Sequence, residues 1–155
     1  MEDRKYRMYS IVMYNISSMQ KGVQTAHAVI DYSIKHGGNY DFRNYAKNDK
    51  TLIILDGGTY QDMVDLKNNL DSLNVKYGYF EEPDLNNCIT SICFLVDDRV
   101  WNFKEYPDYE KWYKSNNNCE NVIFDDYNYE KYSVFVGGEK NFFLKEFIRR
   151  KKLSI

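Results

Sequence analysis

The order of apolar and polar residues predicts a chain in which strands alternate with helices. Four mostly apolar, β-rich segments are expected to be strands, and they span residues 6–14, 51–55, 75–80 and 88–96. Helical patterns connect the first three segments, so those strands should lie largely parallel, with right-handed crossovers. The short connection at Asn86-Asn87 indicates instead that the last two strands pair in an antiparallel manner.

The first helical pattern has clear ends and a clear apolar face. Ser17 followed three residues later by Gln20 is a capping-box pattern, which predicts that a helix begins at the next residue after Ser17. Gly37-Gly38 should end that helix. Apolar residues recur along it at helical spacing and predict a buried stripe formed by Val23, Ala26, Ile30 and Ile34. His27 lies at the border of this stripe and is expected to be at least partly buried.

The remaining patterns complete a single α/β domain over residues 1–155. Further helices are expected at residues 40–48, after Thr59, at about 108–114 and at about 140–152. Residues 101–132 show no clear period and are rich in aromatic side chains, so we expect an ordered insertion at about 101–136. The expected fold is a mixed four-stranded sheet with helices packed on it.

The composition excludes several classes of protein. Of the 155 residues, 43% are hydrophobic and 28% are charged, which is typical of a globular chain and not of a disordered or collagen-like one. No apolar run approaches the roughly 18 residues of a membrane span, and no signal-peptide pattern is present, so a cytoplasmic protein without membrane contact is expected. The three cysteines lack metal-binding spacing, so we expect free thiols and neither a metal nor a cofactor. The bias toward residues with AT-rich codons suggests a bacterial or viral genome, and a phage protein would act in the host cytoplasm.

The charge distribution limits how the chain could bind nucleic acid. The formal net charge is -2 and the sequence pI is about 5.7, which excludes a wholly basic face. Basic residues nevertheless crowd the C-terminus, at Lys145, Arg149, Arg150, Lys151 and Lys152. A local basic patch on the last helix is therefore expected.

Two segments at the carboxyl ends of predicted strands carry groups suited to chemistry. Residues 17–21 place free backbone N–H groups, a helix N-terminus and Lys21 together, which favours an anion site without a glycine-rich cradle. On the same helix Gln20, Gln24 and His27 lie on one polar stripe. A helix flank with internally satisfied hydrogen bonds is the alternative interpretation of that stripe.

The second segment, residues 81–87, holds three carboxylates in four positions, with Pro83 between them. Clustered acids can have separated pKa values, as general acid and base catalysis requires. Thr90 and Ser91 follow near the same edge of the sheet. The alternative is a solvated acidic loop, and the spacing of the acids fits no familiar metal cage.

The motif Gln24-Thr25-Ala26-His27-Ala28, placed after a strand and a turn with lysine, resembles the type 2 peptidyl-tRNA hydrolase family. The resemblance implies cleavage of the ester between a peptide and tRNA without a metal or cofactor. It also implies a catalytic set that consists of Lys21, Gln24, Glu82, Asp84 and Thr90. Two departures stand out: Gln20 occupies the position of the family's lysine, and residues 81–87 replace the family's Asp-Ala-Gly-Arg-Thr loop.

Two main functions follow as hypotheses. The first is a peptidyl-tRNA or aminoacyl-tRNA esterase, with substrate contacts from Gln20, His27, Asn86, Arg149 and Arg150. The second is a non-catalytic phage accessory protein that binds a nucleotide, such as a host immune signal, or a host protein. A purely structural or interaction protein is a third option, and a homodimer remains open.

Overall fold

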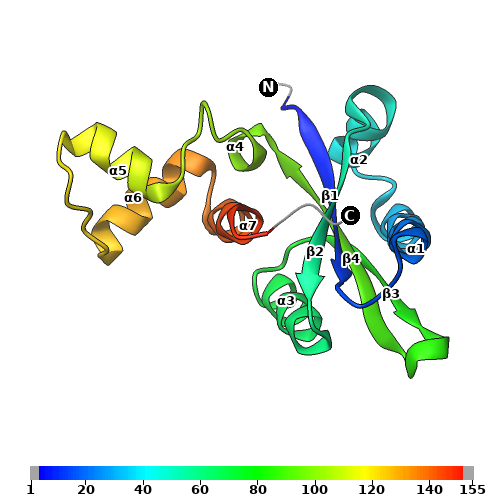
Figure 1. Cartoon of the computed structure of the whole chain (residues 1–155). Coiled ribbons are helices and arrows are strands. Elements are labelled where there is room, and N and C mark those ends of the chain that lie inside the picture. The colour runs from blue at the N-terminus through cyan, green and yellow to red at the C-terminus, as the bar shows by residue number, and fades with distance from the viewer. Residues whose placement is uncertain (1–3, 152–155) are drawn as a thin grey trace. The chain divides into compact units, whose positions relative to one another are not determined.

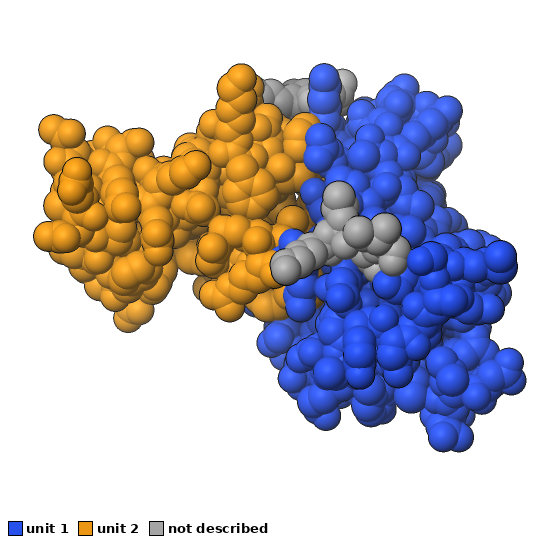
Figure 2. Space-filling model, in the orientation of Figure 1, with its two compact units in different colours: residues 1–95, 151–155 blue, residues 96–150 orange. Residues whose placement is uncertain are grey.

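A computed structural model describes residues 4–151, which form four strands and seven α-helices (Figure 1). The described chain divides into two compact units (Figure 2). Unit 1 contains residues 4–95 and Lys151, and unit 2 contains residues 96–150. The boundary falls a few residues before the expected insertion, and unit 2 includes the last helix as well. That the whole chain forms one domain stays a prediction.

The central sheet is mixed and four-stranded, as the sequence predicts. Its strands are β1 (Tyr6–Met13), β2 (Leu52–Gly58), β3 (Tyr77–Glu82) and β4 (Cys88–Asp97), in the order β2-β1-β4-β3. β1 and β2 are parallel, and β3 and β4 form the expected antiparallel pair. Figure 1 shows that β4 is antiparallel to β1. β2 continues through Asp56, Gly57 and Gly58, where the sequence suggested a stop.

Two helices cover opposite faces of the sheet. Met8 clusters with Ala28 and Tyr32 of α1 (Ser18–His36), on one face. Ile11 lies an odd number of residues from Met8 on β1, so its side chain points to the other face, toward α3 (Tyr60–Ser72). On that face Met63 of α3 lies so close to Gly57 that a Cβ on Gly57 would be 2.5 Å from Met63 Sδ. Burial on both faces explains why the strands read as continuous apolar runs.

The contact between α1 and the edge strand β3 is especially close. A Cβ on Gly78 would collide with Ala28 O and would lie 2.5 Å from Tyr32 N, so only glycine fits there. The Asp31 carboxylate accepts a hydrogen bond from Tyr79 N at 3.0 Å. This bond occupies a backbone donor of an edge strand that could otherwise recruit another strand.

The predicted inner face of α1 is wrong. The buried residues of α1 are Gln24, Thr25, Ala28 and Tyr32. The expected stripe faces solvent instead: Val23 is 42% exposed, Ile30 58% and Ile34 79%, and Ala26 is exposed as well. His27 is also exposed. The helix buries its polar side instead of the apolar stripe because that polar side hydrogen-bonds to polar side chains on the sheet, as described below.

Side-chain capping determines where α1 and α3 of unit 1 begin. Ser17 caps α1, with its side chain accepting from Gln20 N at 3.2 Å, as predicted. Thr59 caps α3 in a reciprocal capping box with Asp62. The helix expected at 40–48 is α2 (Tyr40–Asn44), continued by the π-helical turn η1 (Tyr45–Asp49).

Unit 2 contains four helices and an aromatic core. They are α4 (Asp98–Trp101), α5 (Tyr109–Asn117), α6 (Asp126–Val136) and α7 (Glu139–Arg149). The sequence pattern missed α6. Its core side is made of aromatic rings, and Tyr132 packs edge-to-face on Tyr109 at 5.5 Å and on Phe142 at 5.1 Å between ring centroids. The Tyr132 hydroxyl donates to Pro107 O at 2.7 Å, which satisfies the polar end of that buried ring.

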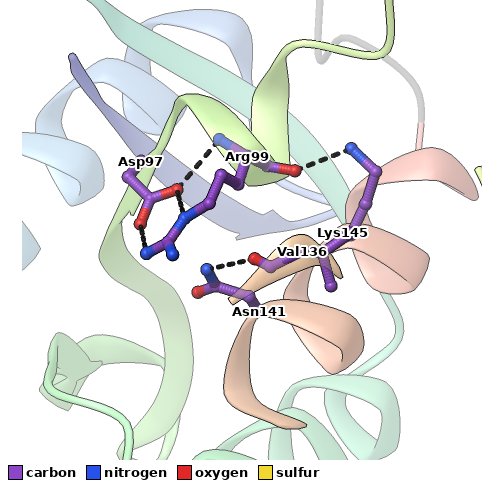
Figure 3. A network of polar contacts seen from close by, with 5 residues as sticks. All are labelled: Asp97, Arg99, Val136, Asn141 and Lys145. Carbon is purple, nitrogen blue, oxygen red and sulfur yellow. Dashed lines mark hydrogen bonds and ion pairs between the residues drawn. The ribbon is translucent and has the colours of Figure 1, made fainter. Parts of the chain in front are cut away.

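Polar contacts join three helices of unit 2 (Figure 3). Lys145 of α7 is 1% exposed, and its Nζ donates to Arg99 O at 2.9 Å and Val100 O at 3.0 Å, carbonyls of the last turn of α4. Arg99 forms an ion pair with Asp97 at 2.8 Å. Asn141 Nδ2 donates to Val136 O at 2.7 Å, at the end of α6. These bonds satisfy backbone carbonyls that helix ends leave free.

Candidate functional site

A buried glutamine links three segments that are far apart in the sequence. Gln24, on the sheet side of α1, is 3% exposed. Its Oε1 accepts from Thr90 Oγ1 at 2.8 Å, and its Nε2 donates to Glu82 Oε2 at 2.8 Å. Its backbone carbonyl accepts from Ser91 Oγ at 2.7 Å. We call Gln20, Gln24, Glu82, Thr90 and Ser91 the Gln24 cluster.

A β-bulge aims two adjacent hydroxyls at the same glutamine. Phe80 pairs with Ser91 and Glu81 pairs with Ile89, so Thr90 is an extra residue on β4. In a regular strand, neighbouring side chains point to opposite faces, but a bulge turns the extra residue. Thr90 and Ser91 therefore both reach Gln24 of α1.

All the hydrogen-bonding groups of the Gln24 amide are used inside the protein. Its oxygen accepts from Thr90, and its nitrogen donates to Glu82 and, at 3.4 Å, to Gln20 Oε1. Thr90 itself is 0% exposed. That Gln24 and Thr90 contact a substrate stays a prediction; in this geometry Gln24 bonds to both Thr90 and Glu82.

Glu82 is the carboxylate that the cluster positions. Its side chain is half-buried, and Oε1 accepts from Asp84 N at 3.2 Å while Oε2 is held by Gln24. This contact caps the 3₁₀ turn η2 (Pro83–Leu85). A carboxylate with both oxygens fixed but still open to solvent can orient and deprotonate a water molecule.

The other predicted loop residues are less tightly held. Asp84 joins the cluster through its backbone amide, and its side chain is exposed. Asn86 is exposed too and has a left-handed backbone with φ of 53°. Asparagine tolerates that conformation better than most residues, so Asn86 serves the turn that connects β3 to β4.

Lys21 and His27 lie on α1 on either side of Gln24 in the sequence. Lys21 is half-buried in the second turn of the helix, three residues before Gln24. Residues three apart on a helix are neighbours, so Lys21 lies next to the cluster. The exposed His27 ring stacks on Phe80, with 4.2 Å between centroids and 14° between planes.

Burial of Lys145 and one shared carboxylate reduce the predicted basic patch on the last helix. Lys145 is buried, and desolvation lowers its pKa to about 8 in spite of nearby carboxylates. Arg149 lies 2.9 Å and Arg150 3.7 Å from Glu146 Oε2. Lys152 lies outside the described residues. Arg149 and Arg150 line a cavity of about 580 Å³ in unit 2, together with aromatic rings that include Phe124.

Across residues 4–151 there is no group of three or more His, Cys, Asp or Glu side chains that could hold a metal ion. In the same range no helix is both long and apolar enough to cross a membrane.

Sequence reasoning missed part of the polar network. It named Ser91 only as a neighbour, and it did not foresee that Ser10 Oγ and Thr25 Oγ1 lie 2.8 Å apart between β1 and α1. The available signal was the presence of polar residues inside apolar strands, at Ser10 and at Thr90-Ser91. Buried hydroxyls need partners, and the opposite helix face supplies them.

No protein-family model matches the chain, and no curated protein matches its sequence. The likeness to type 2 peptidyl-tRNA hydrolases therefore remains a prediction from the motif on α1.

Proposed function

We propose that the chain hydrolyses the ester bond of peptidyl-tRNA or aminoacyl-tRNA, with Glu82 as the general base. The observation that supports the proposal is the Gln24 cluster, because Gln24 binds a carboxylate and a threonine 58 and 66 residues away in the sequence. An arrangement that immobilises a solvent-open carboxylate beside a lysine suits hydrolysis of an activated ester.

The reaction would need two steps. Glu82 takes a proton from a water molecule whose oxygen attacks the ester carbonyl, and an oxyanion forms. The intermediate then collapses, the bond to the ribose oxygen breaks, and Glu82 returns the proton to that oxygen. The Lys21 ammonium would stabilise the oxyanion or hold a nearby phosphate. Gln24 acts as a positioning residue because it hydrogen-bonds to Glu82. Thr90 acts in the same way through its hydrogen bond to Gln24.

A second candidate is favoured by one specific observation. Gln24 and Thr90 have their hydrogen bonds satisfied within the protein, as in a structural network that carries out no chemistry. The same fold could then bind a nucleotide or another anion at Lys21 without cleaving it. The two candidates differ in whether the wild-type protein has any turnover.

The decisive experiment is single-turnover deacylation of peptidyl-tRNA with the full chain in excess. The proposal expects Glu82→Gln and Lys21→Ala each to lower the rate by about 10²-fold or more. Glu81→Gln is a matched control, because Glu81 is the exposed neighbour on β3 and no contact joins it to Gln24. It should change the rate by less than about twofold.

Thermal unfolding of each variant separates lost chemistry from lost folding. A wild-type rate no faster than that of buffer would reject the esterase and leave the binder. Equal losses in Glu82→Gln and Glu81→Gln would show that Glu82 has no special role.

A further inference from the structure

Helix α1 carries an apolar stripe that nothing in unit 1 covers. We define the α1 stripe as Met19, Val23, Ala26, Ile30 and Ile34. Met19 is 79% exposed, Val23 42%, Ile30 58% and Ile34 79%, and Ala26 is exposed as well. Successive members are four, three, four and four residues apart, so they lie along one side of the helix. The sheet packs on the other side, through Gln24, Thr25 and Ala28 (Figure 1).

Such a continuous stripe is unusual on a surface helix. Single exposed apolar residues are common, but contiguous patches of a few hundred Å² generally mark interaction sites. No charged side chain lies within the stripe. Asp31 and Lys35, which alternate with Ile30 and Ile34 along the helix, form an ion pair with each other at 2.8 Å.

From this geometry we infer that α1 is the interface of a symmetric dimer, in which two copies of the chain pack their α1 helices antiparallel. A two-fold interface must be self-complementary, so each residue must find a suitable partner in the same stripe. A two-fold axis beside Ala26 places Met19 of one copy against Ile34 of the other, and Val23 against Ile30. Large side chains then meet at both ends of the contact.

The small residues of the helix lie where two backbones would come closest. Ala26 is at the centre, and Gly22 has no other atom within 4 Å of where its Cβ would be. Helices whose contact residues are small can approach to the short end of the usual interaxial range of about 8–10 Å. Bulky residues at the ends and small ones at the centre thus fit a pair of identical helices.

The available area indicates a reversible dimer. The exposed part of the stripe amounts to roughly 400 Å², at the scale of the largest apolar patch on a typical monomer. Two copies bury it twice, and flanking residues such as Gln20 and His27 bring the total to about 1,000 Å², the lower limit for a specific interface. We expect a dissociation constant in the micromolar range.

Analytical ultracentrifugation of the full chain over a wide concentration range tests the inference. The wild type should show a reversible monomer–dimer equilibrium. Ile30→Glu should weaken it by about tenfold or more, since it places a charge against Val23 of the other copy within the apolar contact. Val134→Glu is the matched control, because Val134 is 76% exposed on α6, outside the stripe. It should leave the equilibrium unchanged, and at concentrations below the dissociation constant both variants should keep the wild-type melting temperature.

A mixing experiment tests the register. Val23→Glu alone and Ile30→Lys alone should both be mostly monomeric. Mixed together they should form a heterodimer, because residue 23 of one copy faces residue 30 of the other and the two new charges are opposite. A mixture that associates no more than its components would overturn the antiparallel arrangement.

Other outcomes would overturn the inference as a whole. A wild type that stays monomeric throughout, or a dimer that Ile30→Glu leaves intact, would each do so. A monomer that co-sediments with vesicles of anionic phospholipid would assign the stripe to a lipid surface instead. The test does not depend on the esterase proposal, because the substituted residues Val23 and Ile30 lie outside the Gln24 cluster.

Discussion

The two units bury their helices by different means. In unit 1, α1 is held on the sheet by hydrogen bonds that Thr90 and Ser91 donate to Gln24, in addition to apolar packing, and a glycine lies at the closest approach. In unit 2, α5, α6 and α7 meet through aromatic rings, with Tyr132 between Tyr109 and Phe142. Hydrogen bonds are directional, whereas ring packing is more tolerant of small shifts. The directional interface is the one that carries the candidate site.

The difference shows how a site can be positioned by the same contacts that hold the fold. A buried amide that is fully satisfied fixes its partners within tenths of an ångström, at the risk of a large loss when one partner is removed. An aromatic core provides stability from buried area without fixing any one reactive group. Four predictions test this contrast, ordered from the largest expected effect to the smallest.

Gly78→Ala should break the close approach of α1 and β3. The added Cβ collides with the backbone of α1, which must move away, at a cost of about 3 kcal/mol. Gly22→Ala, on the same helix in open space, should instead stabilise the protein by about 0.5–1 kcal/mol. Urea unfolding followed by circular dichroism measures both changes.

Tryptophan fluorescence adds a second probe to that experiment, because both tryptophans, Trp101 and Trp112, lie in unit 2. A fluorescence transition that stays at its wild-type urea concentration in Gly78→Ala would show that unit 2 unfolds separately. A stability of Gly78→Ala equal to that of the wild type would contradict the packing argument.

Because of Lys145, the free energy of unfolding of unit 2 should depend on pH in the alkaline range. Its pKa is about 8 when folded and 10.5 ordinarily, so between these values the unfolded chain binds more protons than the folded one. Stability should therefore rise with pH through this window as the buried charge is lost, by roughly 3 kcal/mol.

Lys145→Met removes the titrating group and should lack this rise. All other titrating groups are common to both proteins, so the difference between the two isolates Lys145. Parallel pH profiles of urea-unfolding free energies for the wild type and Lys145→Met would contradict a buried, charged lysine.

Gln24→Leu and Tyr132→Phe compare the two interfaces directly. Gln24→Leu keeps the size of the side chain but removes the partner of Thr90 Oγ1 and of Glu82 Oε2, at a cost of about 1–2 kcal/mol. Tyr132→Phe loses one hydroxyl whose acceptor is a single carbonyl, and should cost about 1 kcal/mol or less. Thermal unfolding measures both, and a larger loss in Tyr132→Phe would reverse the proposed contrast.

His27→Ala should have the smallest effect. The ring is exposed and its described contact is the stack on Phe80, so its removal should cost about 0.5–1 kcal/mol. His27→Phe, which can keep the stack, should be nearly neutral. If deacylation is observed, a loss of rate in both variants at unchanged stability would give His27 a part in the chemistry.

Much of the candidate site could be predicted from residue types near strand ends together with the family resemblance of the motif on α1. Gln24, Glu82 and Thr90 were expected together, and direct hydrogen bonds join them. The roles within the site were less predictable. Whether Gln24 contacts a substrate or a carboxylate depends on a β-bulge, and a bulge arises from the pairing of two strands, which one strand's sequence does not reveal.

The sequence by itself determined the alternation of strands and helices, the antiparallel pairing of β3 with β4 and the helix starts at Ser17 and Thr59. These features depend on residues within a few positions of one another, so local propensity and capping are enough to decide them. Only the tertiary structure decided which side of α1 is buried, where Lys145 lies and that residues 126–136 form a helix. A polar helix face can be buried when distant hydroxyls satisfy it, and a helix without clear periodicity can form when rings from other helices pack around it.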